Sequence, residues 1–246
     1  MKVTHPRFVS ALAALAASAA LATSASAAVV FNETFEGYTL GDVAGQGLWA
    51  DFGGAELTNV VDTMANGGTK SLAFSTKPAG GYGSDATFDL VAPITAGQLV
   101  LSFDIFHPTT NDGDGFFYFS RGATLATVFQ QGISLEARGT AGTFGDDGSP
   151  KTGLLTGQWV PVVMNIDLDA DTLVATYGGT QIFNGAWITD AGLPSQYQGI
   201  DIWADGGTSG GSFYIDNLRL DAVPEPSSIA LLGLGAGGLF FRRRRA

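Results

Sequence analysis

The chain of 246 residues contains no Cys, has 35 Gly and carries a formal net charge of −11 at pH 7. The lack of cysteine excludes a disulfide-stabilised scaffold, and the acidic balance excludes a nucleic-acid-binding surface, which needs clustered Lys and Arg. Glycine at this frequency without a three-residue period excludes collagen and indicates many tight turns.

The first 27 residues are typical of a secretory signal peptide. Lys2 and Arg7 provide a positive start, and residues 8–21 form an apolar run rich in Ala and Leu. Ala25 and Ala27 have the small-x-small spacing that signal peptidase recognises. We therefore expect an N-terminal signal helix over residues 1–27, export through the inner membrane and cleavage after Ala27.

Residues 28–222 are long enough for one well-packed domain. Short stretches rich in Val, Ile, Phe, Thr and Leu alternate there with Gly, Asp, Asn and Ser clusters, as in strands joined by turns. In residues 99–106 every second residue, from Leu99 to Ile105, is a large apolar residue on one face, as in a half-buried strand. The pattern predicts an all-β fold, a single antiparallel jelly-roll β-sandwich whose first strand, near residues 31–35, pairs with its last, residues 213–220.

The aromatic residues of this region can either pack in the core or form exposed platforms for a ligand. We expect most of them, including Trp49, Trp159 and Trp203, in the core between the two sheets. Glycan sites instead need exposed rings beside polar groups. Three candidates for such platforms, with partial burial as the alternative, stand in Gly-rich or polar surroundings: Tyr82, Trp187 and Tyr197.

The acidity is concentrated in the same region, because half of the 12 Lys and Arg residues belong to the two ends of the chain. Residues 28–222 hold six basic and 22 acidic residues, a formal charge of −16. Such a charge suits solvation outside the cell and also divalent-cation binding. Asp167, Asp169 and Asp171 alternate and would share one face of a strand, where they either chelate a cation or form a solvated hairpin edge.

The C-terminal residues 223–246 form a third segment. It begins with Val223-Pro224-Glu225-Pro226, continues with an apolar run over residues 229–241 and ends with Arg242-Arg243-Arg244-Arg245 before the last Ala. Proline cannot continue a central strand, so the domain ends here. A helix over the apolar run spans about 20 Å, short of a ~30 Å membrane core, so Ser227, Ser228 and a snorkelling Arg242 are needed for a minimal transmembrane helix.

This order of elements closely resembles the PEP-CTERM sorting signal of Gram-negative bacteria. The resemblance implies that an exosortase recognises Pro224, Glu225 and Pro226, while the Arg cluster stops transfer on the cytoplasmic side. It further implies transient membrane anchoring on the periplasmic side, then release to the outer surface or the exopolysaccharide matrix. The same tail is also labelled an ice-binding-protein C-terminal motif, although the domain has no Thr-x-Thr array.

Two stretches of the domain resemble concanavalin-like sandwiches and carbohydrate-binding modules. Asp114-Gly115-Phe116-Phe117-Tyr118-Phe119 is similar to the Asp-Gly-x-Ala-Phe strand start of L-type lectins, with Phe117 in place of the small residue. That resemblance implies that Asp114 lies in a sugar site. Residues 32–37 and 214–218 look like the first and last strands of carbohydrate-binding modules, which implies a structural calcium ion at Glu36 and Asp216.

Motifs for catalysis or for other metals are weak. Asn111-Asp112-Gly113-Asp114-Gly115 lacks the final acid of an EF-hand loop and predicts a turn. Without Cys, and with His107 the only histidine after the signal peptide, the sequence offers neither a nucleophile triad nor a histidine zinc site. We expect His107 in an ordinary loop and assign no catalytic residue.

The leading hypothesis is therefore an exported, non-catalytic, glycan-interacting β-sandwich of the cell surface or exopolysaccharide matrix. Its candidate ligand-binding residues are Asp114, Tyr82, Trp187 and Tyr197. One alternative is a structural or adhesive surface protein that calcium stabilises and that has no sugar site. The other is a divergent polysaccharide hydrolase or lyase, which would need two carboxylates in one cleft.

Overall fold

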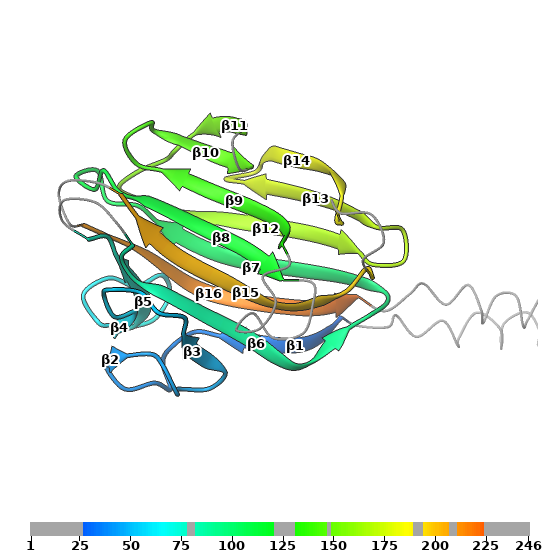
Figure 1. Cartoon of the computed structure of the whole chain (residues 1–246), viewed down its shortest axis with the longest axis horizontal. Helices are drawn as coiled ribbons and strands as arrows, with labels where there is room; N and C mark the ends of the chain where they lie inside the picture. The colour runs from blue at the N-terminus through cyan, green and yellow to red at the C-terminus, as the bar shows by residue number, and fades with distance from the viewer. Residues whose placement is uncertain are drawn as a thin grey trace, which may run out of the picture. The chain divides into compact units, whose positions relative to one another are not determined.

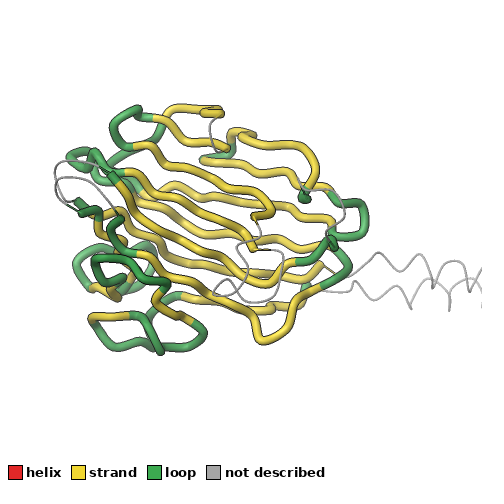
Figure 2. Tube along the Cα trace, in the orientation of Figure 1, coloured by secondary structure: helices red, strands yellow, loops and turns green. Residues whose placement is uncertain are grey.

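The computed structural model divides into two units, Val29–Ala222 and the chain ends 1–28 with 223–246. The structure describes residues 27–77, 82–120, 131–146, 149–188, 194–206 and 211–223. Strands and loops make up the described part of the chain (Figure 2), as the sequence predicted. The predicted signal helix and the predicted C-terminal helix lie outside the described residues.

Two antiparallel sheets form a sandwich, and Figure 1 shows one of them in front of the other. The front sheet contains β3 (Trp49–Asp51), β6 (Asp85–Ile94), β8 (Asp114–Ser120), β9 (Gln131–Arg138), β10 (Thr143–Asp146), β11 (Ser149–Gly153) and β15 (Tyr197–Asp205). Its strand order is β11-β10-β9-β8-β15-β6-β3, and we call it the seven-stranded sheet.

The second sheet has nine strands in the order β14-β13-β12-β7-β16-β5-β4-β2, with β1 paired to β16. Its strands are β1 (Ala28–Glu33), β2 (Gly41–Asp42), β4 (Asn59–Val61), β5 (Ser71–Ser75), β7 (Gln98–Phe106), β12 (Trp159–Asp167), β13 (Thr172–Tyr177), β14 (Thr180–Ala186) and β16 (Ser212–Val223). The pairing of β1 with β16 confirms that the first and last strands of the domain are neighbours.

The strands β7 and β12 are neighbours in the middle of the nine-stranded sheet, and their alternating side chains explain how they pair. Along β7 every second residue is buried, and β12 follows the same period of two. Phe103 lies opposite Val162 and Leu101 lies opposite Met164, so the buried sets of the two strands coincide. A slip of one strand by one residue would turn its own buried set to solvent, which is why the hydrophobic pattern determines this register.

Aromatic rings from both sheets meet in the core. Phe117 of β8 packs with its ring centroid 5.2 Å from Phe103 and 5.8 Å from Phe213, both of which belong to the nine-stranded sheet. Phe213 in turn stacks on Phe74 at 5.2 Å. Trp49 lies in the same core with 2% of its surface exposed, as predicted.

Trp159 and Trp203 do not lie in the core, which corrects the sequence-based expectation for these two residues. Each is only partly buried, because it occupies the position of its strand that alternates with the core-facing residues. On β12 the neighbour Val160 faces the core, and on β15 the neighbours Ile202 and Ala204 do so. Trp159 therefore lies on the outer face of the nine-stranded sheet and Trp203 on the outer face of the seven-stranded sheet.

Replacement of Phe117 should be among the most damaging changes to the fold. Phe117→Ala removes a fully buried ring that both sheets enclose. We expect it to lower the free energy of unfolding by about 3–5 kcal/mol, measured by urea denaturation. The control Val91→Ala, at a position that is 93% exposed, should change stability by less than about 0.5 kcal/mol. Equal effects of the two changes would contradict this account of the core.

Candidate functional site

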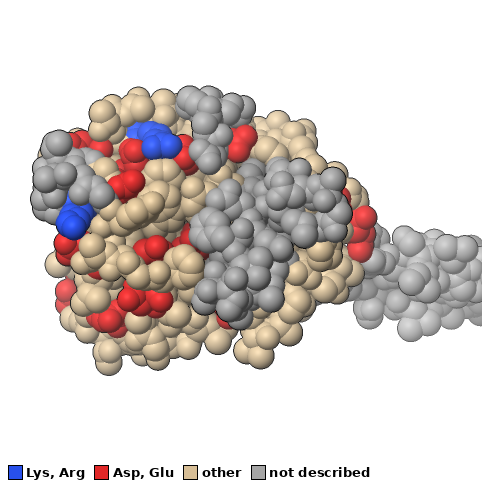
Figure 3. All heavy atoms as spheres, in the orientation of Figure 1, with Lys and Arg blue, Asp and Glu red and all other residues tan. Residues whose placement is uncertain are grey.

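The outer face of the seven-stranded sheet carries an unusual set of polar and aromatic side chains. Along β8, Phe117 and Phe119 belong to the core, so Asp114, Phe116 and Tyr118 point to the other side of the sheet. This face is turned toward the viewer in Figure 1, and Figure 3 shows acidic side chains gathered on it. We call it the front face.

The strand register arranges the side chains of the front face in rows that run across the strands. Trp203 of β15 lies opposite Phe116 of β8, which lies opposite Glu136 of β9. In the next row Asp205 lies opposite Asp114, which lies opposite Arg138. Side chains that are about 20 to 90 residues apart in the chain thus become direct neighbours across the sheet.

Four aromatic rings form a cluster on this face. The rings of Phe116 and Trp203 stack with centroids 3.9 Å apart and an interplanar angle of 9°. Tyr118 lies 6.0 Å from Trp203 on the same surface. Tyr82 lies 5.3 Å from Trp203 and is 64% exposed, so its ring is open to solvent. The cluster therefore runs from a buried end at Phe116 to an exposed end at Tyr82.

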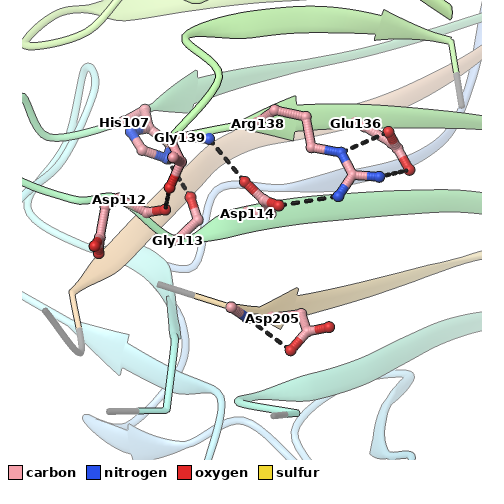
Figure 4. Close-up of polar contacts among 10 residues, drawn as sticks. His107, Asp112, Gly113, Asp114, Glu136, Arg138, Gly139 and Asp205 are labelled. Carbon is pink, nitrogen blue, oxygen red and sulfur yellow. Dashed lines mark hydrogen bonds and ion pairs between the residues drawn. The ribbon is translucent and has the colours of Figure 1, made fainter. Parts of the chain in front are cut away.

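Arg138 lies at the buried end of the aromatic cluster, between two carboxylates (Figure 4). Its Nε and Nη2 each donate to Glu136 at 2.7 Å, and its Nη1 donates to Asp114 at 3.0 Å. The guanidinium carbon lies 4.7 Å from the centre of the Phe116 ring, a cation–π distance. Desolvation opposes the charge, but the hydrogen bonds to Glu136 and Asp114 outweigh it and raise the pKa of Arg138.

A pocket of about 430 Å³ opens beside this ion-paired group. The residues that line it include Asp114, Glu136, Arg138, Thr140, Thr143 and Asp146. Asp114 also accepts the backbone N–H of Gly139 at 2.9 Å, which holds its carboxylate in place. Hydroxyls and carboxylates can both accept hydrogen bonds from a ligand rich in O–H groups. The three carboxylates outnumber the single Arg in this lining, so the pocket is acidic.

A pair of carboxyl groups lies farther along the front face, on the neighbouring strands β6 and β15. Asp201 is 1% exposed and hydrogen-bonds to Asp85. Burial, the charge and hydrogen bond of Asp85 and the charge of Asp89 together raise the pKa of Asp201 to about 9. Burial also raises the pKa of Asp85. The pair therefore retains a proton at neutral pH.

The four ligand-binding candidates from the sequence have different outcomes. The structure places Asp114 in the pocket and Tyr82 at the exposed end of the aromatic cluster. Trp187 and Tyr197 are fully buried, which corrects the expectation that their rings are exposed. The Trp187 indole N–H donates to the Gln196 carbonyl at 3.0 Å, which satisfies its polar atom inside the core.

Four residues of the front face were not identified as ligand-binding from the sequence. Phe116 lies within the lectin-like stretch, whereas Trp203, Glu136 and Arg138 belong to no motif. The only signal for them was the alternation of β8, β9 and β15 with core-facing neighbours. Which strands lie beside one another decides whether these residues meet. That information is not contained in any local pattern.

The predicted calcium pair, Glu36 and Asp216, lies in a separate polar network. Glu36 accepts the backbone N–H groups of Thr69 and Lys70, each at 2.8 Å. Asp216 is 1% exposed and accepts the N–H of Asn66 at 2.8 Å. Burial is the main cause that raises the pKa of Asp216, and the charge of Glu36 adds to it, so the two carboxylates are electrostatic neighbours.

No group of three or more His, Cys, Asp or Glu side chains that could hold a metal ion occurs among the described residues. Asp167, Asp169 and Asp171 instead accept backbone N–H groups around the β12–β13 hairpin, as the hairpin-edge alternative predicted. Asn111 accepts the N–H of Gly113 at 2.9 Å, which agrees with the predicted turn. His107 directly follows the end of β7, where it is buried, and its Nε2 lies 3.0 Å from the Gly113 carbonyl.

Comparison with known families identifies the C-terminal tail. Residues 222–245 match the model of the PEP-CTERM protein-sorting motif, which confirms the predicted sorting signal. The motif marks an exported protein of the cell surface and implies processing by an exosortase. Within the described residues, no helix has the length and apolarity to cross a membrane. The predicted transmembrane span and the Arg cluster lie outside those residues.

Solved structures share the sandwich fold of the domain at low sequence identity. The catalytic domain of a glycoside hydrolase family 131 protein from Coprinopsis cinerea is 13% identical, with a TM-score of 0.54 over 81% of this chain and 96% of that one. The globular domain of T. cruzi calreticulin is 11% identical, with a TM-score of 0.52 over 86% of this chain and 94% of that one.

A sialidase is also similar, at 13% identity and a TM-score of 0.55 over 81% of this chain. The aligned part spans 19% of the length of that sialidase. No curated protein matches the sequence of this chain. At these identities the similar structures establish the fold, a concanavalin-like β-sandwich, and the function has to be argued from the residues of the front face.

The carboxyl pair predicts a pH-dependent stability. The folded state binds the Asp201 proton more tightly than the unfolded chain does, so the free energy of unfolding should fall as pH rises from 3.8 to about 9. Asp201→Asn mimics the protonated form and should flatten this slope, measured as Tm at pH 5 and pH 8.5. Asp221→Asn, at a carboxylate whose pKa Arg219 lowers, is the control and should not flatten it. An Asp201→Asn variant with the wild-type slope would contradict the assignment.

Proposed function

We propose that the protein is a non-catalytic glycan-binding domain that acts at the cell surface or in the exopolysaccharide matrix after exosortase processing. The observation that carries this proposal is the aromatic cluster of Tyr82, Trp203, Tyr118 and Phe116 beside a polar pocket on the front face. Sugars have apolar C–H faces and a rim of hydroxyls, so they bind where flat rings lie next to hydrogen-bonding groups.

The exposed end of the cluster is the part of the front face best suited to bind a ligand. Tyr82 exposes 64% of its surface, while Trp203 beside it is partly buried and supported by Phe116. A supported ring loses little conformational freedom when a sugar stacks on it, which favours binding. Phe116 itself is 5% exposed and acts as the support rather than as the platform.

The charges of the front face favour a neutral glycan over an acidic one. Arg138 is neutralised by its two ion pairs with Glu136 and Asp114, so it offers no free positive charge to a uronate or sulfate group. The pair of Asp85 and Asp201, which shares a proton, adds one further negative charge nearby. An anionic chain would be repelled, whereas sugar hydroxyls would donate hydrogen bonds to the carboxylates.

A glycan-active enzyme is the second candidate function, and the carboxyl pair is the observation that favours it. Asp201 keeps a proton at neutral pH beside Asp85, on the same face as Trp203, and a protonated carboxyl group is what general acid catalysis of glycosidic cleavage requires. The sialidase, the glycoside hydrolase and a Trichoderma reesei endo-β-1,4-glucuronan lyase with a TM-score of 0.51 have this fold. Asp201 is 1% exposed, however, which favours a structural role for the pair.

A structural or adhesive role without a sugar site is the remaining candidate. In that case Glu36 and Asp216 would bind calcium together with oxygen atoms of the adjoining loop. The buried Asp216 has the like charges of Asp104 and Glu36 close by, and a bound cation would relieve their repulsion. Calcium binding is also compatible with the glycan-binding proposal, because this network is separate from the front face.

Removal of the Trp203 ring tests the glycan-binding proposal. We expect the protein to bind neutral polysaccharides on an array, and Trp203→Ala and Tyr82→Ala each to lower the affinity about tenfold or more by isothermal titration calorimetry. Leu40→Ala removes a side chain that is 53% exposed outside the front face and should bind like the wild type. No retention of any glycan by the wild type would refute the proposal, and release of sugar fragments would favour the enzyme.

Chelation tests the calcium proposal independently. If calcium binds at Glu36 and Asp216, EDTA should lower Tm, since a ligand at ~100 times its Kd stabilises the folded state by about 2.7 kcal/mol. Asp216→Asn should remove the difference between EDTA and calcium, whereas Asp221→Asn should keep it. A Tm that does not respond to EDTA would rule out a stabilising calcium ion. A response to EDTA without any glycan binding would favour the structural role.

A further inference from the structure

Three aromatic side chains form a second row, on the outer face of the nine-stranded sheet. Trp159 of β12 lies directly opposite Phe106 of β7, with ring centroids 5.5 Å apart. Tyr214, on the next strand β16, lies 6.2 Å from Phe106 in an edge-to-face arrangement. All three are partly buried and alternate with core residues, so their remaining surface faces solvent. This row lies on the opposite side of the sandwich from the front face.

A pocket of about 450 Å³ opens at the end of this row. Phe106 and Tyr214 form its aromatic wall, and Thr109, Thr110, Asn111 and Ser212 supply polar groups. The described residues that line it include no charged side chain. The lining is thus uncharged although residues 28–222 carry a formal charge of −16, and the pocket volume falls within the ~300–1,000 Å³ range of small-molecule sites.

Asn111 provides a separate sign that the pocket takes a ligand. The residue is 6% exposed, and its Oδ1 accepts the N–H of Gly113 at 2.9 Å, which defines the orientation of the amide. Its Nδ2 is buried and has no hydrogen-bond partner in the described part of the chain. A buried donor without an acceptor is unfavourable, and such groups are rare in folded proteins. A ligand with an oxygen acceptor would satisfy it.

We propose that this pocket is a second carbohydrate site, which binds one unit of a neutral glycan. The Tyr214 and Phe106 rings would stack on the sugar, Asn111 Nδ2 would donate to one of its oxygens, and the Thr and Ser hydroxyls would hydrogen-bond to the others. A purely apolar partner would leave the Asn111 donor unsatisfied. An anion would meet no positive side chain among the lining residues and a strongly negative domain around them.

Two glycan sites on opposite sheets have a consequence for the matrix. A domain that binds one polysaccharide at the front face and another at the second site links the two polysaccharides without dimerising. This consequence rests on the proposed function, whereas the second site does not. Crosslinking of long chains also multiplies weak single-site affinities, because the second contact becomes intramolecular.

The four tryptophans of the chain allow the two sites to be observed separately. Trp159 reports on the second site and Trp203 on the front face, while Trp49 and Trp187 are 2% and 0% exposed and serve as internal references. We would label the full-length protein with 5-fluorotryptophan and record ¹⁹F NMR spectra during titration with laminarihexaose, cellohexaose or mannohexaose. An alginate hexasaccharide is the anionic comparison. Single Trp→Phe changes assign the four signals.

The expected result is a saturable shift of the Trp159 signal with at least one neutral hexasaccharide and none with the anionic one. Tyr214→Ala should weaken this binding about tenfold by removing the platform, and Asn111→Asp about fivefold or more by removing the donor while keeping the turn acceptor. Trp203→Ala is the matched control on the other sheet and should leave the Trp159 response unchanged. Unchanged Tm values of the variants verify their folding.

Each other outcome identifies which proposal fails. A shift of Trp203 alone overturns the second site and leaves the proposed function intact. A shift of Trp159 alone supports the second site and overturns the front face. A Trp159 shift that persists in both Tyr214→Ala and Asn111→Asp also overturns the second site, as does a shift with alginate of equal size. If neither signal moves with any of the three neutral sugars, both proposals fail for this class of ligand.

Discussion

The contact between the two sheets at Phe117 is the constraint on which the candidate site depends. Phe117 lies between Phe103 and Phe213, and at Gly115, two residues earlier on the same strand, a Cβ atom would come within 2.8 Å of the Phe213 ring. β8 is therefore held so closely against the nine-stranded sheet that only glycine fits there. Because successive side chains alternate, the same contact turns Phe116 and Asp114 to the front face.

The electrostatics of the domain follow from its excess of acid. With few basic residues available, Arg138 binds two carboxylates at once and lies over an aromatic ring, an arrangement that the planar guanidinium group allows. Elsewhere the carboxylates accept backbone N–H groups at loops, as Glu36 does, or share a proton, as Asp201 does with Asp85. The excess of acidic residues, 22 against six basic ones, supports the neutral, hydroxyl-rich ligands that we propose for both aromatic rows.

The two rows differ in how they are built, although each uses aromatic residues at positions that alternate with the core. Around Phe116 the rings adjoin a charged network, in which polar groups are satisfied by one another. Around Tyr214 the lining is uncharged and one buried amide donor is left over. A satisfied network holds the rings in position. A buried donor without a partner destabilises the free protein, and a ligand that accepts its hydrogen bond removes this cost.

Local patterns determined much of this protein. The sorting tail follows from residue order, and the all-β sandwich follows from a period of two, because burial of one face of a strand demands alternation. The same alternation located the core residues of β7 but could not tell whether the aromatic residues Trp187, Tyr197 and Trp203 face inward, since that depends on register and on the strand beyond. Only the tertiary structure brought Arg138 to Asp114 and Trp159 to Phe106, because hydrogen-bonded neighbours across a sheet are distant in the chain and no local propensity encodes their pairing.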